Sequence, residues 1–260
     1  MDLGLNGKTA LVLGGTAGLG RAIALSLAGE GAKVAVAGRN KEKLARIEGE
    51  LGGKGRGLAL EWDLSDRSLI EPRVAQVEAA LGPVDILVNN TGGPPPTPAA
   101  GQPPELWLKN FEALVLSVIA ITDRVLPGMR SRRWGRIITS TSSGIVAPIP
   151  NLAMSNALRL SLVGWSKTLA REVAGEGVTV NIILPGRIAT DRLSFLDEQR
   201  AKREGRPVEE VERESRNGIP AGRYGDPAEY GDTVAFLAST RAGYITGSTI
   251  RVDGGLIPSI

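Results

Sequence analysis

The chain has 260 residues, of which 42% are hydrophobic, and a net charge of +3, which together allow one large α/β domain with an ample core. It contains no cysteine, which excludes disulfides and thiolate catalysis. It also contains no histidine, which excludes a Ser-His-Asp triad and the usual zinc sites, so we expect no bound metal.

Short apolar runs rich in β-formers alternate along the chain with longer stretches of helical spacing. Strands are predicted at 8–13, 33–37, 56–60, 84–88, 136–140, 179–184 and 247–252. Helices are predicted at 18–29, 41–51, 68–81, 105–132, 152–174 and 226–238. Strands that alternate with helices form βαβ units, so we expect a single Rossmann-like α/β domain over 1–260, a doubly wound parallel sheet with helices on both faces.

Two segments depart from this alternation. Residues 92–104, "GGPPPTPAAGQPP", contain prolines that cannot lie inside a helix or a central strand, so this segment is a stiff loop. Residues 190–217 are long and highly charged. They are either a solvated helix pair or a mobile lid over a substrate, and a lid can itself be a helix pair.

A basic cluster follows the predicted long helix and consists of Arg130, Arg132, Arg133 and Arg136. A solvated helix end, where cations suit the helix dipole, is favoured over a nucleic-acid patch. We therefore expect no nucleic-acid partner. The chain has no long apolar run and no signal-peptide pattern, so we expect a cytoplasmic protein without membrane association.

Three glycines lie at the junction of the first strand and the first helix. Gly14, Gly18 and Gly20 are spaced G-x-x-x-G-x-G in "LVLGGTAGLGRAIA". Glycine here lets the backbone turn tightly and approach a pyrophosphate, which binds at the helix N-terminus. The motif predicts a dinucleotide site.

The end of the second strand bears on the choice of dinucleotide. An NAD-binding unit usually has Asp or Glu there to accept from the ribose 2′-hydroxyl, whereas this chain has Gly38 followed by Arg39. A guanidinium in place of a carboxylate favours the 2′-phosphate of NADP over NAD. The alternative is an exposed arginine that begins a helix.

The stretches "NNTGG" (89–93), "TVNIILPGRIATD" (179–191) and "GRYGDPAEYGDTVAFLASTRAGYITGSTIRVDGG" (222–255) resemble the short-chain dehydrogenase/reductase family. The likeness runs nearly end to end and is greatest to the 3-oxoacyl-[acyl-carrier-protein] reductase branch. It implies a Rossmann-like domain, a nicotinamide cofactor, a small carbonyl or alcohol substrate and a homotetramer. The cofactor residues that it implies, together with those of the glycine motif, are Gly14, Thr16, Gly18, Leu19, Gly20, Arg39, Asp63, Leu64, Asn89, Asn90, Gly92, Pro185, Gly186, Ile188 and Thr190.

The resemblance also implies a catalytic Ser, Tyr, Lys and Asn. The family's Ser falls on Ser142, whereas Ser155 stands at the Tyr position, Arg159 at the Lys position and Leu114 at the Asn position. The only tyrosines are Tyr224, Tyr230 and Tyr244, and none has a lysine four residues later.

Each of these catalytic assignments has a structural alternative. Ser142 is otherwise a strand-end hydroxyl that bonds its own backbone, Ser155 a helix N-terminal residue, and Arg159 a surface or interface arginine. Arg159 stays charged, with an ordinary pKa above about 12, so it cannot shuttle protons.

Two functions follow from these residues. The first is an NADP-dependent oxidoreductase with an atypical proton-delivery site, acting on a carbonyl/alcohol pair. An anionic group on such a substrate would contact Arg159 or Arg187. The second is a non-catalytic NADP-binding protein, such as a redox sensor or assembly subunit. A hydrolase or lyase has little support, because no carboxylate pair is evident.

Overall fold

The computed structural model describes residues 1–260 and contains one seven-stranded sheet. All neighbouring strands pair in parallel, in the order β3-β2-β1-β4-β5-β6-β7. The strands are β1 (Thr9–Val12), β2 (Lys33–Gly38), β3 (Gly57–Glu61), β4 (Ile86–Asn89), β5 (Gly135–Ser140), β6 (Val178–Pro185) and β7 (Thr249–Val252). The expected doubly wound Rossmann-like fold is confirmed, and the order reverses direction between β1 and β4.

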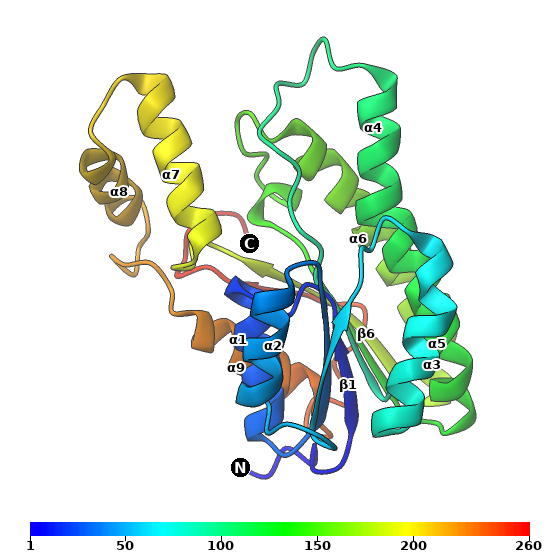
Figure 1. The fold of residues 1–260 in the computed structure, drawn as a ribbon. Coiled ribbons are helices and arrows are strands. Elements are labelled where there is room, and N and C mark those ends of the chain that lie inside the picture. The colour runs from blue at the N-terminus through cyan, green and yellow to red at the C-terminus, as the bar shows by residue number, and fades with distance from the viewer.

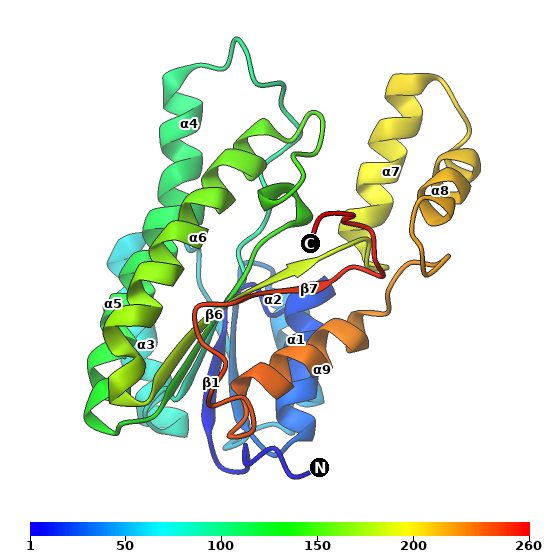
Figure 2. The same cartoon turned by 180° about the vertical axis from the view of Figure 1, so that it is seen from behind.

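Helices cover both faces of this sheet (Figure 1). The α-helices are α1 (Gly18–Gly29), α2 (Lys41–Glu50), α3 (Ile70–Leu81), α4 (Pro104–Phe111), α5 (Ser117–Ser131), α6 (Ala153–Val173), α7 (Asp191–Glu204), α8 (Val208–Asn217) and α9 (Pro227–Ala238). The short turns are η1 (Arg67–Leu69), η2 (Glu112–Leu116), η3 (Ser143–Ile145) and η4 (Ala174–Glu176). Seen from behind, α7 and α8 stand apart from α4 and α6, beyond the same end of the sheet (Figure 2).

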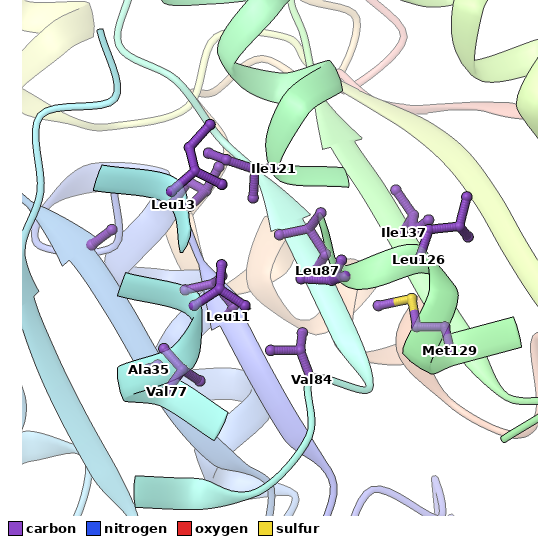
Figure 3. Packing of buried hydrophobic residues seen from close by; sticks show 14 of the residues in the cluster. Leu11, Leu13, Ala35, Val77, Val84, Leu87, Ile121, Leu126, Met129 and Ile137 are labelled. Carbon is purple, nitrogen blue, oxygen red and sulfur yellow. The ribbon is translucent and has the colours of Figure 1, made fainter. Parts of the chain in front are cut away.

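Two large apolar clusters explain why the helices take these faces. One cluster packs α3, α5 and α6 against side chains such as Leu11, Leu87 and Ile137 (Figure 3). The other packs α1, α2 and α9 against the alternate strand residues. The central strands β1, β4 and β5 are buried on both faces, as parallel sheets require, and this explains their largely apolar sequence, whereas the edge strands β3 and β7 are only partly buried.

The predicted long helix at 105–132 is not one regular α-helix. A π-helical turn, η2, separates α4 from α5 and is centred on Leu114. A π-turn is an i→i+5 distortion that helical periodicity does not reveal, and such turns are frequent at functional sites.

The basic cluster is mostly engaged within the chain. Arg130 pairs with Glu176, and Arg132 donates to the carbonyl oxygen of Val84. Arg136 contradicts the expected solvated helix end, because it lies in β5 and is buried. Its guanidinium stacks on Trp134 and donates to backbone carbonyls, which fixes the loops at the amino edge of the sheet.

The proline-rich loop is tied to the start of α6. The Thr97 N–H donates to the carbonyl of Asn151 at 2.8 Å, and the Ala153 N–H donates back to Thr97 at 3.2 Å. The charged segment 190–217 forms the helix pair α7 and α8. None of the helices is long and apolar enough to cross a membrane.

Candidate active site

The turn between β1 and α1 can accept only glycine at key positions. Gly14 and Gly18 have φ of +59° and +52°, a region that side chains disfavour. A Cβ on Gly20 would lie 2.1 Å from the carbonyl oxygen of Gly14. The N-terminus of α1 has no side-chain cap, so its N–H groups are available to a phosphate. This cradle fits a dinucleotide pyrophosphate.

The end of β2 is packed against the same turn. A Cβ on Gly38 would lie 2.5 Å from Cγ2 of Thr16, so a carboxylate side chain at residue 38 would displace Thr16. Arg39 is mostly exposed, and its Nη1 lies 3.9 Å from Asp63 Oδ2. Hydrogen bonds from Ser65, and then the charge of Arg39, lower the pKa of Asp63. Leu64 beside it is half-buried against the core.

The two asparagines after β4 have different surroundings. Asn89 is buried, and its Nδ2 donates to the hydroxyls of Thr122 and Thr139, which joins β4 to α5 and β5. Asn90 donates to the carbonyls of Leu13 and Gly14 and so supports the glycine turn. Both contacts are internal. A direct cofactor contact by Asn89 therefore stays a prediction.

The loop after β6 approaches the glycine turn from the other side. A Cβ on Gly186 would lie 2.5 Å from the Cα of Asp253, so Pro185 and Gly186 are pressed against the C-terminal segment. Ile188 is buried and bridges to Gly225. Thr190 caps α7, and its Cγ2 would lie 3.6 Å from a Cβ on Gly18. The glycine turn after β1, Asn90 after β4 and Thr190 after β6 thus lie close together at the carboxyl end of the sheet.

Arg159 lies at the carboxyl edge of the sheet and is 6% exposed. Its Nη1 donates to Ser140 O at 3.2 Å, and its Nη2 donates to Thr91 O and Gly92 O, both at 3.1 Å. The alternative of a surface arginine is therefore wrong, because the side chain is buried within its own chain. Desolvation lowers the pKa of Arg159 to about 10, below the expected value, yet the group remains a cation at neutral pH.

Ser155 lies one helical turn before Arg159, on the same face of α6, and is buried. The helix begins at Ala153 without a side-chain cap, so Ser155 does not serve as an N-cap. Ser142 precedes η3, and its Oγ accepts from the Gly144 N–H at 3.2 Å, as the structural alternative expects. Because the Ser142 hydroxyl only accepts in this bond, its proton remains available for donation to a ligand.

Leu114 belongs to a small apolar cluster. It packs with residues of α6 and of its own helix, among them Met154 and Leu158, and is 4% exposed. No polar atom of this side chain faces the site.

The three tyrosines lie elsewhere. Tyr244 is fully exposed, and the Tyr224 hydroxyl donates to Asp197 of α7 at 2.7 Å while its ring lies against Arg216 of α8. Tyr230 is buried under the opposite face of the sheet, where its hydroxyl lies 2.8 Å from Ser140 Oγ. Burial raises the pKa of Tyr230, so this phenol is a poor acid.

Sequence reasoning missed Arg192, at the start of α7. Its Nη2 donates to Pro94 O at 3.0 Å, so the helix pair is joined to the proline-rich loop. Arg187, expected to be free for an anion, instead donates to buried Asp197 at 2.9 Å. No local pattern distinguishes these two arginines, because their partners lie in different segments.

A family model described as "Enoyl-(Acyl carrier protein) reductase" matches residues 14–257. A 3-oxoacyl-[acyl-carrier-protein] reductase, FabG, of Escherichia coli is 40% identical over 257 residues, which cover 98% of this chain and 99% of that one. The chain belongs to the short-chain dehydrogenase/reductase family.

Other relatives extend this similarity. A D-beta-hydroxybutyrate dehydrogenase of Cupriavidus necator is 36% identical over 258 residues, 97% of this chain and 99% of that one. L-sorbose reductase from Gluconobacter frateurii, solved with NADPH and L-sorbose, has a TM-score of 0.92 at 30% identity and full coverage of both chains. Family membership makes this chain a NAD(P)-dependent oxidoreductase of the type that acts on carbonyl and alcohol groups.

Proposed function

We propose that this protein is an NADPH-dependent reductase of a small carbonyl compound in which no tyrosine delivers the proton. The observation that carries the proposal is the position of Ser155 and Arg159. Both lie on one face of α6, at the carboxyl edge of the sheet that also holds the glycine turn. Hydride donor and acceptor can be aligned there by binding alone.

The preference for NADP over NAD is supported at the end of β2. Gly38 has no room for a carboxylate while Thr16 keeps its position, and Arg39 is exposed beside it. A guanidinium forms strong paired hydrogen bonds with a phosphate. NADP would supply the hydride donor in its reduced form, and Asp63 would border the adenine.

The source of the proton distinguishes this site from the family pattern. A serine hydroxyl is a much weaker acid than a phenol, whose pKa is about 10, and Arg159 does not release its proton near neutral pH. We therefore assign to Ser142 and Ser155 a water molecule that gives a proton to the substrate oxygen as the hydride reaches the carbonyl carbon; the hydroxide left behind regains a proton from solvent. Without a positioned acid, the rate falls by about 10²–10⁴-fold.

The test is kinetic. NADPH oxidation is measured against ketones, 3-oxoacyl thioesters and quinones, and the active substrate is then used with Ser155→Ala. We expect slower turnover with little change in NADPH affinity. Ser161→Ala is the matched control, because Ser161 lies on the same helix and its hydroxyl donates to Leu158 O. Turnover that Ser155→Ala leaves unchanged would refute the serine-held water.

A non-catalytic NADP-binding protein is the second candidate. Leu114 favours it, because a buried leucine cannot hold a relay water where the family has an asparagine. Micromolar NADPH binding without turnover across the whole panel would select this function over the first.

The assembly proposed with this function is a homotetramer of single-domain subunits, residues 1–260, in which α7 and α8 act as the substrate lid. Leu108 on α4 and Leu160 on α6 support the assembly, because they are large apolar side chains exposed by 59% and 52%. Light scattering of the full chain tests it.

A further inference from the structure

Two arginines from different elements hold one short loop. Arg159 donates to the carbonyls of Thr91 and Gly92, and Arg192 donates to the carbonyl of Pro94. The guanidinium of Arg192 also lies against Gly93, where a Cβ would be 3.1 Å from Nη2. The two cations therefore flank residues 91–94, one from α6 and one from the lid helix α7.

Neither cation has a carboxylate partner. No Asp or Glu oxygen lies within 4.0 Å of either guanidinium, and their hydrogen bonds go to neutral backbone carbonyls. Other arginines in and beside the helix pair form ion pairs with acids; these are Arg187 in the loop before α7, Arg200 on α7, Arg206 between the helices and Arg216 on α8. The chain thus leaves a pair of positive charges uncompensated at its candidate active site.

The positions of these charges are unfavourable in the absence of an anion. Arg159 is buried, and a buried charge without an opposite charge is costly. Arg192 lies in the first turn of α7, where the helix dipole opposes a cation. Desolvation lowers the pKa of both groups, and the charge of Arg192 further lowers the pKa of Arg159.

Donors remain for a ligand. A guanidinium has five N–H groups, and the hydrogen bonds described above use three on Arg159 and one on Arg192. The loop is open at Gly92, where a Cβ would meet nothing within 4 Å. Arg192 is itself exposed, so a ligand can reach it.

We propose that Arg159 and Arg192 bind the carboxylate of the substrate, which makes the substrate an oxo acid or the corresponding hydroxy acid. This inference rests on the proposed reductase function and names its substrate class. Arg159 forms the base of the carboxylate site, and Arg192 closes it from the lid. The hydrogen bond from Arg192 to the carbonyl of Pro94 already joins α7 to the loop, so an anion bound between the two arginines would stabilise the closed lid.

The experiment compares acids with their esters on the full chain saturated with NADPH. The probes are 4-methyl-2-oxopentanoate and acetoacetate, each beside its methyl ester, and affinity is measured by calorimetry and by KM where turnover occurs. The wild type should bind at least one acid about tenfold or more tightly than its ester. Arg192→Gln should abolish that difference, and Arg192→Lys should restore part of it.

Arg203→Gln is the matched control, because Arg203 is an exposed arginine of the same helix without an ion pair. It should leave the preference unchanged. Equal binding of acids and esters by the wild type, or no binding of any probe, would overturn the proposal. So would a loss of NADPH affinity in Arg192→Gln with the acid preference intact, which would place Arg192 on the cofactor diphosphate. Failure of the reductase function itself is seen separately, as wild-type protein that does not bind or oxidise NADPH.

Discussion

The guanidinium of Arg159 donates to the carbonyl oxygen of Ser140 across 3.2 Å, so a buried cation ties α6 to the end of β5.

The pKa of Arg159, about 10, sets the pH range over which this cation can attract an anionic ligand. The folded-state pKa lies below the ordinary 12.5, so the cation is present below pH 10 and is lost as the pH rises through that value. We expect the affinity for oxo acids to fall as the pH rises through the pKa of about 10, while their methyl esters show no such fall. Calorimetry between pH 7 and pH 10.5 measures both. In Arg159→Lys, burial acts on an ammonium group, whose ordinary pKa is lower than that of a guanidinium, so the affinity for oxo acids should begin to fall at a lower pH. If the affinity of this variant depends on pH in the same way as that of the wild type, a group other than residue 159 titrates.

Arg39 should control the choice of coenzyme. In Arg39→Ala, the affinity for NADPH should fall about tenfold or more, because a charge-assisted contact to the 2′-phosphate is lost, while NADH binding is unchanged. Fluorescence titration of both coenzymes measures this. Lys43→Ala removes another exposed cation from the first turn of α2 and should change neither affinity. An equal loss for both coenzymes would contradict a 2′-phosphate contact.

Gly20 and Gly49 both lie in helices, but replacing each of them with alanine should change the free energy of unfolding in opposite directions. Gly20→Ala places a Cβ 2.1 Å from Gly14 O, so it should lower the free energy of unfolding by roughly 1–3 kcal/mol and weaken NADPH binding. Gly49→Ala meets nothing within 4 Å and should raise the free energy of unfolding by about 0.5–1 kcal/mol. Urea unfolding of both variants gives the values. If Gly20→Ala binds NADPH normally, the glycine turn is not the pyrophosphate site.

Asp197 should hold the helix pair in place. Its carboxylate accepts from Arg187 at 2.9 Å and from the Tyr224 hydroxyl at 2.7 Å, and it is buried. Asp197→Asn leaves Arg187 without its opposite charge, so amides of α7 should exchange with deuterium at least tenfold faster, with β4 and β5 unchanged. Glu198→Gln, at an exposed neighbouring acid, is the control. Unchanged exchange in α7 would mean that other contacts fix the lid.

Restoring the family's side chains should raise activity. In the triple variant Leu114→Asn, Ser155→Tyr and Arg159→Lys, a phenol replaces the hydroxyl on the face of α6 that carries Ser155. Reduction of a neutral ketone should increase about 10²-fold or more, the usual contribution of a positioned acid. Initial rates of NADPH oxidation measure it, with Ser155→Phe in the same background as the control. Equal rates in the two variants would show that the tyrosine hydroxyl does not reach the substrate.

Local sequence patterns predicted the sheet well, because period and turn residues determine which segments become strands. The bounds of α1 were predicted to the residue, and the Gly14 turn followed from strand, glycine spacing and helix together. The π-turn at Leu114 was missed, since apolar spacing is nearly the same in π and α turns. The strand that begins at Arg136 was predicted correctly, but the solvated surroundings expected for this arginine were wrong, because tertiary packing buries the side chain.

The candidate site was predictable only in part. Its positions along α6 followed from family spacing, but the three carbonyl partners of Arg159 come from the end of β5 and the loop after β4, which no local pattern connects to it. The same holds for Arg192, whose partner Pro94 is 98 residues away in sequence. Long-range contacts of this kind decide whether an arginine is a surface residue or part of a site.

The contact between Thr16 and Gly38 also constrains how this sequence can evolve. The Cβ of an aspartate at residue 38 would lie 2.5 Å from Thr16 Cγ2, so Gly38→Asp should cost stability unless the threonine side chain moves or a smaller residue replaces it. The cost of Gly38→Asp should therefore be smaller in a Thr16→Gly background than in the natural sequence. A lineage that changes its coenzyme would meet this coupling as epistasis, in which the effect of one substitution depends on whether the other has already occurred.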